Sequence, residues 1–308
     1  MKGLELSKKY YEAFGAPMLH EQFAPFEEII AVGLCGSGSE CFGFDDDVSH
    51  DHDFEPGFCL FLPGEDVIDR RTAFLLERAY AKLPKSFLGF ERAPLSPVGG
   101  SRHGVIRMDD FFRSKVGAPD GRLTVGQWLS VPEFYFAEAT NGEVFRDDCG
   151  AFTAVRERLS AMPEDVRLKK LAGSLLLMAQ SGQYNYARCI AHGEPGAAAL
   201  ALHEFTGAAL HAVFLLNRAY LPFYKWQFRA LRGLPRLKEL EPVLTELLTG
   251  KAGDPQAAIE TVCAAVLGEL HTQALTTQTC GDLEKHAYSV NDRITDPELR
   301  NLNILAGV

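Results

Sequence analysis

The sequence predicts an α+β protein, with a mixed sheet and helices in the first part of the chain and an all-helical bundle in the second. Three observations predict this class. Residues 29–34 form a short apolar run that ends in a glycine-rich turn, as a buried strand does. Residues 69–83 place apolar side chains at helical spacing. From about residue 145 onward the periodic segments are helical, so the expected domains are residues 1–145 and 146–308.

In the first part, strands and a helix alternate along the chain. Residues 50–62 partly alternate and are rich in aromatic side chains, which predicts a second strand interrupted near Pro56 and Gly57. The helix over 69–83 follows, with an acid before its first turn. A turn-rich stretch then leads to a third strand at 104–108.

The second part is predicted to be helical throughout. Several of its expected helices begin with proline, whose missing N–H costs nothing in the first turn of a helix. The sequence contains no internal repeat and no low-complexity linker. The expected helices span residues 151–161, 163–179, 196–220, 224–231, 235–248, 255–275 and 297–305.

The composition excludes several classes of protein. Hydrophobic residues make up 46% of the 308 residues and charged residues 23%, as in ordinary globular proteins. No continuous apolar run approaches the ~20 residues of a membrane span, and the first residues lack the apolar core of a signal peptide. The seven cysteines are scattered without a CxxC pair, which indicates reduced thiols. We therefore expect a cytoplasmic protein that does not contact a membrane.

The formal net charge of −10 is unevenly distributed. Residues 1–150 carry 25 acidic and 15 basic side chains, whereas residues 151–308 carry 16 of each. Seven acids lie between Glu40 and Glu55, where they repel one another unless solvent or a cation compensates. Residues 205–238 contain six basic side chains and no acid. These two regions suit a metal and a polyanion, although a solvated loop and an ordinary basic helix face are the alternative. An acidic chain with one basic stretch gives no reason to expect nucleic-acid binding.

The segment that follows the first strand is suited to binding phosphate. Glycines in such a turn let backbone N–H groups approach a phosphate closely, and a serine hydroxyl adds a further donor. The turn consists of Gly36, Ser37, Gly38 and Ser39.

A pair of carboxylates follows the turn. If residues 51–54 are extended, Asp51 and Asp53 project from one face and can share divalent cations, Mg²⁺ or Mn²⁺. Phosphate donors together with metal-binding carboxylates predict a displacement reaction at phosphorus.

Other known motifs fit this segment less well. A Walker A loop needs a lysine, and none occurs between Lys9 and Lys82. A Rossmann fingerprint would need a small residue where Cys41 stands. Zinc bound by His50 and His52 is an alternative, but no Cys/His partner pair is close.

The spacing of these motifs resembles a known superfamily. Gly38 and Ser39, followed after eleven residues by Asp51-His52-Asp53, resemble the hG[GS]-x(9–13)-DhD signature of the DNA polymerase beta-like nucleotidyltransferases. The strings GSGSE and SHDHDF are similar to a bacterial family of unknown function, in which a nucleotidyltransferase domain precedes a helical domain. Three later segments, at 142–152, 183–188 and 214–226, also resemble that family. Kanamycin- and lincosamide-type nucleotidyltransferases share this two-domain plan, which implies a small-molecule acceptor.

The resemblance implies a Mg²⁺-dependent transfer of a nucleoside monophosphate, expected to be AMP from ATP, to an acceptor hydroxyl. Ser37, Ser39 and the backbone around Gly38 would hold the outer phosphates. Asp51 and Asp53 would bind the metal ions, one steadying the triphosphate and the other activating the acceptor, with pyrophosphate as leaving group.

Many active members of the superfamily add a third carboxylate from a neighbouring strand, as metal ligand or base. The strand expected at 104–108 has Val, Ile, Arg and Met at its last four positions. We therefore expect Asp109, or alternatively Asp110, to take this role, with a purely structural function as the other possibility.

The helical part is expected to supply further contacts. In the resembling two-domain enzymes a basic group from the helical half meets the triphosphate. Lys225 is the expected group, supported by Arg229 or Arg232, which follow at helical spacing. A surface position, or pairing with the acidic segment between Glu40 and Glu55, is the alternative for all three. The residues expected at the acceptor or nucleotide are Asn185, Tyr186 and Arg188, for which a role between helices is the alternative.

Two other functions stay open on the sequence. One is a nucleotidyltransferase that modifies a protein or an RNA. The other is a catalytically silent protein that binds nucleotides without transferring them.

Overall fold

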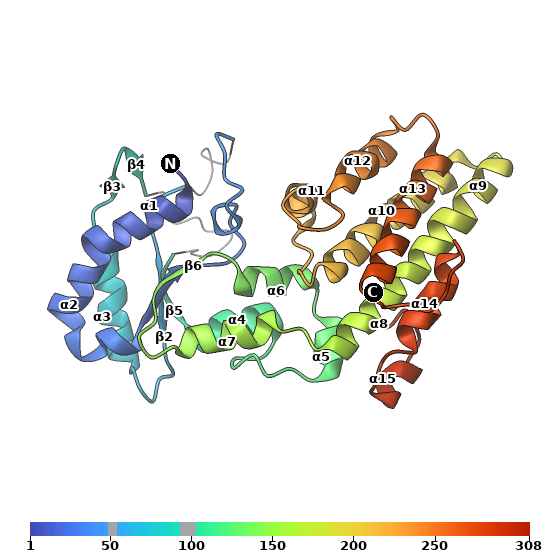
Figure 1. Cartoon of the computed structure of the whole chain (residues 1–308). Helices are drawn as coiled ribbons and strands as arrows, with labels where there is room; N and C mark the ends of the chain where they lie inside the picture. The colour runs from blue at the N-terminus through green and yellow to red at the C-terminus, as the bar shows by residue number, and fades with distance from the viewer. Residues whose placement is uncertain (49–53, 93–102) are drawn as a thin grey trace. The chain divides into compact units, whose positions relative to one another are not determined.

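Four short segments from the first part of the chain form a mixed sheet (Figure 1). The computed structural model describes residues 1–48, 54–92 and 103–308. The strands are β1 (Ala31–Leu34), β2 (Cys59–Leu62), β3 (Ser86–Phe87), β4 (Phe90–Glu91), β5 (Gly104–Arg107) and β6 (Glu143–Arg146). The order in the sheet is β5-β2-β1-β6, and β3 and β4 pair separately. β1 runs antiparallel to both β2 and β6, whereas β2 runs parallel to β5.

Helices cover both faces of this sheet. Asp69 caps the helix that was predicted over 69–83, since its carboxylate accepts a hydrogen bond from Thr72 N at 2.7 Å. The helical segments that accompany the sheet are α1 (Gly3–Tyr10), η1 (Tyr11–Gly15), α2 (Ala16–Phe23), η2 (Ala24–Ile29), η3 (Glu40–Phe42), α3 (Arg70–Ala81), α4 (Met108–Val116) and α7 (Ala151–Ser160).

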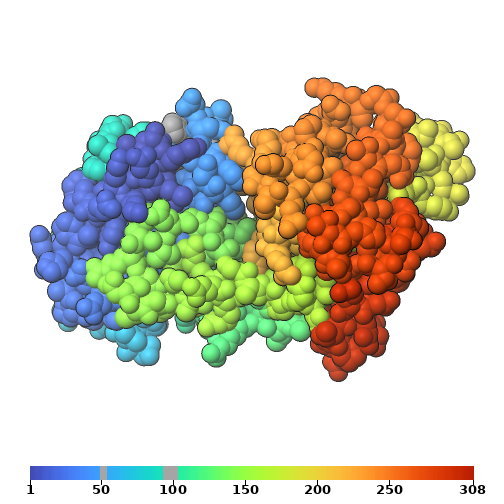
Figure 2. Space-filling model, in the orientation of Figure 1, coloured from blue at the N-terminus to red at the C-terminus, as the bar shows by residue number. Residues whose placement is uncertain are grey.

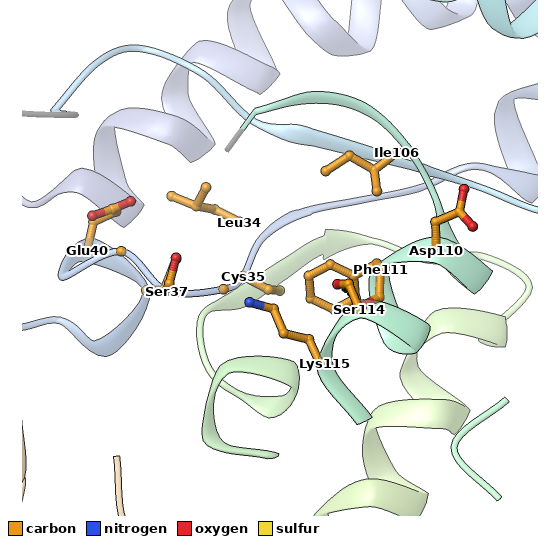
Figure 3. A pocket seen from close by; sticks show the side chains of 12 residues that line it. Leu34, Cys35, Ser37, Glu40, Ile106, Asp110, Phe111, Ser114 and Lys115 are labelled. Atoms are coloured by element: carbon orange, nitrogen blue, oxygen red, sulfur yellow. Dashed lines mark hydrogen bonds between the residues drawn. The ribbon is translucent and has the colours of Figure 1, made fainter. Parts of the chain in front are cut away.

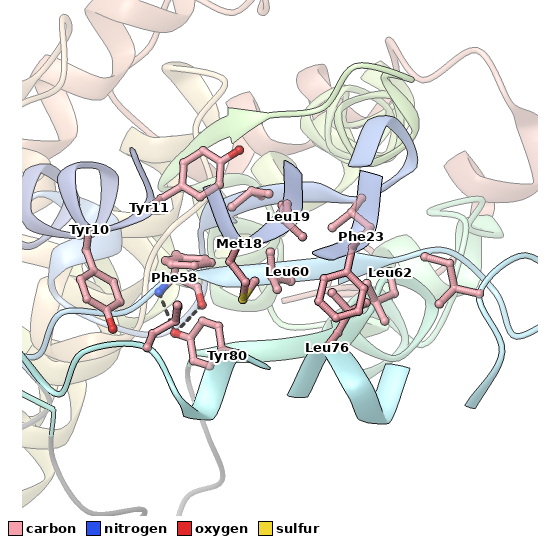
Figure 4. Close-up of a cluster of buried hydrophobic side chains, with 14 residues drawn as sticks. Tyr10, Tyr11, Met18, Leu19, Phe23, Phe58, Leu60, Leu62, Leu76 and Tyr80 are labelled. Carbon is pink, nitrogen blue, oxygen red and sulfur yellow. Dashed lines mark hydrogen bonds between the residues drawn. The ribbon is translucent and has the colours of Figure 1, made fainter. Parts of the chain in front are cut away.

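Alternation along β2 divides the buried side chains between the two faces of the sheet. Leu60 and Leu62 face a cluster that includes Tyr10 of α1 and Leu76 of α3 (Figure 4). The hydroxyl of Tyr80 anchors the approach to β2, because it accepts from the N–H and donates to the carbonyl of Phe58, at 3.0 and 2.9 Å.

The opposite face carries a second aromatic cluster. Phe61 stacks on Phe152 of α7 with ring centroids 4.0 Å apart, and it meets Phe111 of α4 edge to face at 5.1 Å. Phe152 and Phe61 are fully buried. This packing places α4 and α7 on the same side of the sheet.

The chain divides into two compact units, each built from two stretches of sequence. The sheet unit consists of Met1–Leu123 and Tyr135–Ala161, and the helical unit of Thr124–Phe134 and Met162–Val308. This division differs from the single boundary expected at residue 145. Residues 146–161 group with the sheet because Phe152 packs on it, a contact that the helical period of this segment does not reveal.

The helical unit confirms the expected helical character of the second part, and with it the α+β class. Its α8 is buried almost all round and packs against α10 and α14. The helices from residue 124 onward, other than α7, are α5 (Val125–Ser130), α6 (Glu133–Thr140), α8 (Glu164–Met178), η5 (Ala179–Tyr186), α9 (Ala187–Ala191), α10 (Pro195–Leu216), η6 (Tyr224–Trp226), α11 (Gln227–Leu231), η7 (Lys238–Leu240), α12 (Glu241–Thr249), α13 (Pro255–Thr272), α14 (Leu283–Asn291) and α15 (Pro297–Asn301).

Several helices differ from their expected bounds. The helix expected to end at 179 continues as the π-helical segment η5, and the segment 224–231 starts with the 3₁₀ turn η6. The helix α14 was not predicted. Local periodicity marks an apolar face but does not fix where the hydrogen-bond pattern changes, which accounts for these differences.

A buried lysine ties the end of the chain to α8. The Lys169 ammonium donates to Asn291 Oδ1 at 3.0 Å, to the carbonyl of Arg300 at 3.2 Å and to that of Leu302 at 2.7 Å. Its side chain is fully buried. The last two helices, α14 and α15, at the red end of the colour bar in Figure 2, are therefore both tied to α8 by this ammonium.

One helix within the described residues is long and apolar enough, by length and composition alone, to cross a membrane. It is α10, with a mean hydropathy of 1.5 over 18 residues, and 61% of that window is buried in the structure. The apolar residues of α10 do not form one continuous run, because His203, Glu204 and His211 interrupt them. A buried core helix of a folded protein passes the same test.

Candidate functional site

The glycine turn follows β1 directly and is held from a distance by one asparagine. Gly36 N donates to Asn141 Oδ1 at 2.9 Å, and Asn141 Nδ2 donates back to Gly36 O at 2.7 Å. Gly36 has φ +129°, a conformation that side-chain-bearing residues rarely adopt. The turn is therefore fixed by both its own glycine and the Asn141 amide.

An arginine lies behind this asparagine and the end of β1. Arg156 Nη2 donates to the carbonyls of Thr140 and Asn141, at 2.7 and 2.6 Å, and Nη1 approaches Cys35 Sγ at 3.1 Å. Burial raises the pKa of the Cys35 thiol to about 11, and the guanidinium only partly opposes this. Burial likewise raises the pKa of Cys41. Both thiols stay protonated at neutral pH, so neither is an activated nucleophile.

We expect a loss of both stability and ligand affinity when Asn141 is replaced by alanine. The substitution removes two hydrogen bonds and leaves both backbone groups of Gly36 unpaired, which costs about 1–3 kcal/mol per buried group. Urea unfolding and titration with Mg²⁺-ATP measure the two effects. Asn303→Ala is the control, because that side chain caps only the exposed turn before Leu305. Unchanged stability and affinity in Asn141→Ala would mean that other contacts hold the turn.

The backbone of the turn offers a row of free donors. Its carbonyls at Gly38 and Ser39 accept hydrogen bonds from Cys41 N and Phe42 N, at 3.1 and 3.2 Å. By contrast, the N–H groups of four successive residues donate to no acceptor among the described residues: Ser37, Gly38, Ser39 and Glu40. Backbone N–H groups left unpaired in this way form a binding site for an anion.

Glu40 closes one side of the turn with a buried carboxylate. Its exposed fraction is 7%, and Ser39 Oγ is its hydrogen-bond partner at 3.5 Å. The carboxylate lies against Gly38, where an added Cβ would come 1.9 Å from Oε1. Only glycine at position 38 leaves room for this arrangement.

The turn lines a cavity of about 350 Å³ that also reaches α4 (Figure 3). From α4, the polar side chains Asp110, Ser114 and Lys115 line it. Lys115 pairs with the buried Glu138 of α6, with Nζ 2.5 Å from Oε2. The walls of the cavity therefore include the turn with its unpaired N–H groups, the Lys115 ammonium, and the carboxylates of Glu40 and Asp110.

The direction of the strands determines which segments share an edge with the turn. Because β1 is antiparallel to β2, and β2 parallel to β5, the end of β1 lies beside the beginnings of β2 and β5. His103 stands just before β5, with Nδ1 3.0 Å from Glu55 Oε1 in the segment entering β2. A carboxylate–histidine pair therefore occupies this edge of the sheet.

The expected acidic residues fall in three different places. Asp51 and Asp53 lie outside the described residues, as do His50 and His52 of the zinc alternative. Asp109 is exposed in the first turn of α4 and does not line the cavity, whereas Asp110 lines it and pairs with Arg113 at 3.1 Å. Both follow the C-terminal end of β5, the edge opposite to the turn. Within the described residues no three His, Cys, Asp or Glu side chains come together as a metal site.

The expected basic residues lie in the helical unit around one tryptophan. The Trp226 ring has Lys225 Nζ at 4.9 Å and the Arg229 guanidinium at 5.9 Å from its centroid. Arg232, just after α11, pairs at 2.6 Å with Glu241, the first residue of α12. Lys225 is exposed.

The residues expected at the acceptor lie on η5 and α9 of the helical unit. Asn185 and Arg188 are exposed, and Tyr186 is half-buried. Arg188 stacks over the Tyr184 ring at 4.9 Å. None of the three lines the cavity at the glycine turn.

Sequence reasoning missed four residues that shape the cavity. Asn141 stands in an Asn-Gly pair, and Glu40 completes the string GSGSE, so both had a local signal. Arg156 and Lys115 had none, because each lies on a helix whose pattern indicates only an ordinary amphipathic surface.

Comparisons with known proteins give one match. Neither the curated proteins nor the solved structures contain a match to the chain. A family model matches residues 128–227, a range that contains the three later segments at 142–152, 183–188 and 214–226 but not the glycine turn. Over this range the chain is similar to a family described as Domain of unknown function (DUF4037).

Proposed function

We propose that this chain is a Mg²⁺-dependent nucleotidyltransferase of the DNA polymerase beta-like superfamily. It would transfer a nucleoside monophosphate, AMP in the first instance, to a hydroxyl of a small-molecule acceptor. The observation that carries the proposal is the row of four free backbone N–H groups, at residues 37–40, at the end of the central strand β1.

These donors suit a phosphate group for a physical reason. Each N–H carries a partial positive charge and is left without an internal partner, so an oxyanion gains hydrogen bonds at no cost to the fold. Ser37 and Ser39 add hydroxyl groups at the same turn. The cavity beside them, with Lys115 on its far wall, has room for a polyphosphate.

The carboxylates assigned to the metal are Asp51 and Asp53, which the sequence places before β2. β2 begins at the edge where β1 ends, so the chain enters it beside the glycine turn. When bound there, Mg²⁺ would neutralise phosphate charge and polarise the α-phosphorus. The acceptor oxygen would form a bond to that phosphorus while the bond to pyrophosphate breaks.

One observation favours the catalytically silent alternative. The strand β5 carries Gly, Val, Ile and Arg, and the expected third carboxylate Asp109 is exposed outside the cavity. Glu40 and Asp110 are acids that line the cavity with the turn, and Glu55 pairs with His103 at the same edge of the sheet. A base for the acceptor hydroxyl would have to come from groups such as these.

Nucleotide binding and pyrophosphate release test the proposal. The full-length protein is titrated calorimetrically with each of the four NTPs, with Mg²⁺ and with EDTA, and is then incubated with radiolabelled NTP and a metabolite extract. Mg²⁺-dependent binding with labelled small molecules and released pyrophosphate is expected. Binding without pyrophosphate would favour the silent alternative, label on protein or RNA would favour the macromolecular one, and no Mg²⁺-dependent binding would refute the proposal.

A further inference from the structure

Among the described residues that line the glycine-turn cavity, Lys115 is the one basic side chain. Lys115 extends from α4 into the cavity, and in Figure 3 its nitrogen points toward the end of β1 that carries Cys35 and Ser37. The side chain is largely enclosed, with 16% of its surface exposed. The ammonium of Lys115 therefore points toward the turn that carries the unpaired N–H groups.

The ammonium has only one carboxylate partner among the described residues. An ammonium carries three N–H donors, and one of them is taken by Glu138 at 2.5 Å. The Tyr135 ring is a cation–π neighbour, with its centroid 6.0 Å from the ammonium. Two donors of Lys115 are thus left for a ligand, in the same cavity as the unpaired backbone donors of residues 37–40.

Stability alone explains this lysine poorly. A buried Lys–Glu pair must lose the hydration of both charges, and such pairs contribute little net stability. Glu138 is 7% exposed and holds the ammonium at a fixed point. A side chain that is already held in its binding position loses less conformational entropy when a ligand binds.

The other charges of the cavity define the form of the ligand. Glu40 and Asp110 would repel a bare polyphosphate, so the anion that suits the cavity carries its own divalent cation. On the assumption of the proposed nucleotidyltransferase function, we propose that Lys115 binds the outer phosphates of a Mg²⁺-nucleoside triphosphate and that Glu138 is its positioning residue. Lys115 then belongs to the sheet unit's own phosphate site, independently of Lys225.

The expected effect grows with the number of phosphates on the ligand. A charge-assisted contact to phosphate corresponds to a loss of roughly tenfold to a hundredfold in affinity. Lys115→Met should weaken Mg²⁺-ATP and Mg²⁺-tripolyphosphate by that factor and AMP by less than about threefold. Lys115→Arg should keep most of the affinity, because the charge remains. Glu138→Gln should give a smaller loss for the same two ligands.

Two further variants separate binding from folding. Lys115→Met leaves Glu138 as a buried charge without a partner, so the double variant Lys115→Met with Glu138→Gln removes both charges together. Lys8→Met is the matched control, since Lys8 pairs with Glu143 at 2.6 Å in the same unit but outside the cavity. All proteins are titrated by calorimetry with ATP, tripolyphosphate and AMP in Mg²⁺, and their melting temperatures are measured.

The outcomes distinguish this inference from the proposed function. Loss of ATP and tripolyphosphate affinity with AMP affinity kept, in the single and double variants but not in Lys8→Met, supports it. Parent-like affinity in either folded variant, or an equal loss for ATP and AMP, overturns it while nucleotide binding stands. If the parent binds neither ATP nor tripolyphosphate, the proposed function fails and this inference fails with it.

Discussion

Asp51→Asn and Asp53→Asn are each expected to lower Mg²⁺-dependent turnover by about a thousandfold. Metal-ion stabilisation of the charge at phosphorus is worth several kcal/mol, and each 1.4 kcal/mol is about a factor of ten in rate. Asparagine keeps the size of the side chain but removes the charge that the proposed function assigns to binding the cation. Stopped assays of pyrophosphate release measure the rate, and calorimetry with and without Mg²⁺ measures nucleotide binding.

The acidic segment itself supplies the control. Asp47→Asn makes the same change of charge a few residues upstream, at an exposed position that does not line the cavity. Its turnover should stay within about twofold of the parent, because Asp47 has no role in the proposed metal site and salt screens the charges of exposed side chains. Parent-like Mg²⁺-ATP binding in both Asp51→Asn and Asp53→Asn would show that the metal is held elsewhere.

Lys169→Met should lower the free energy of unfolding by about 2–4 kcal/mol, because it removes the ammonium that donates to two otherwise unpaired, partly buried oxygens, on Asn291 and Leu302. The third acceptor, the Arg300 carbonyl, keeps a donor in Asn291 Nδ2 at 3.2 Å. We expect the C-terminal helices α14 and α15 to loosen first, because these oxygens belong to them or follow them. Urea unfolding gives the stability, and hydrogen exchange locates the loosened segments.

An exposed lysine of the same unit tests whether the effect is specific. Lys285 has 63% of its side chain exposed and lies 3.9 Å from Asp282. Lys285→Met should change the stability by less than about 0.5 kcal/mol, as surface ion pairs usually do. If both methionine variants unfold like the parent, water or a rearranged backbone satisfies the oxygens around Lys169.

The local features of the fold could be predicted from the sequence. The strand before the glycine turn was expected at 29–34 and is found as β1, because a short apolar run closed by glycines has few other conformations. The helix over 69–83 is found as α3, with Asp69 as its N-cap. These elements depend on neighbours in sequence, and so their pattern is visible in it.

The contacts that complete the cavity could not be predicted in the same way. Asn141 holds Gly36 across 105 positions of the chain, and no periodicity connects the two. Asp109 was expected at the end of a strand that would approach the carboxylate pair. The direction of β5 places that end at the far edge of the sheet, and strand direction is not encoded in the alternation of side chains.

The interleaving of the two units has a practical consequence for dissecting this protein. A fragment cut at residue 145 would lack α7, so the aromatic face around Phe61 would be uncovered and prone to aggregate. A fragment cut at residue 161 would keep α7 but also carry Thr124–Phe134 of the helical unit, whose buried Glu133 would lose its partners Lys170 and Leu221 of that same unit. Neither truncation yields the sheet unit on its own, because that unit is built from two stretches of sequence separated by Thr124–Phe134.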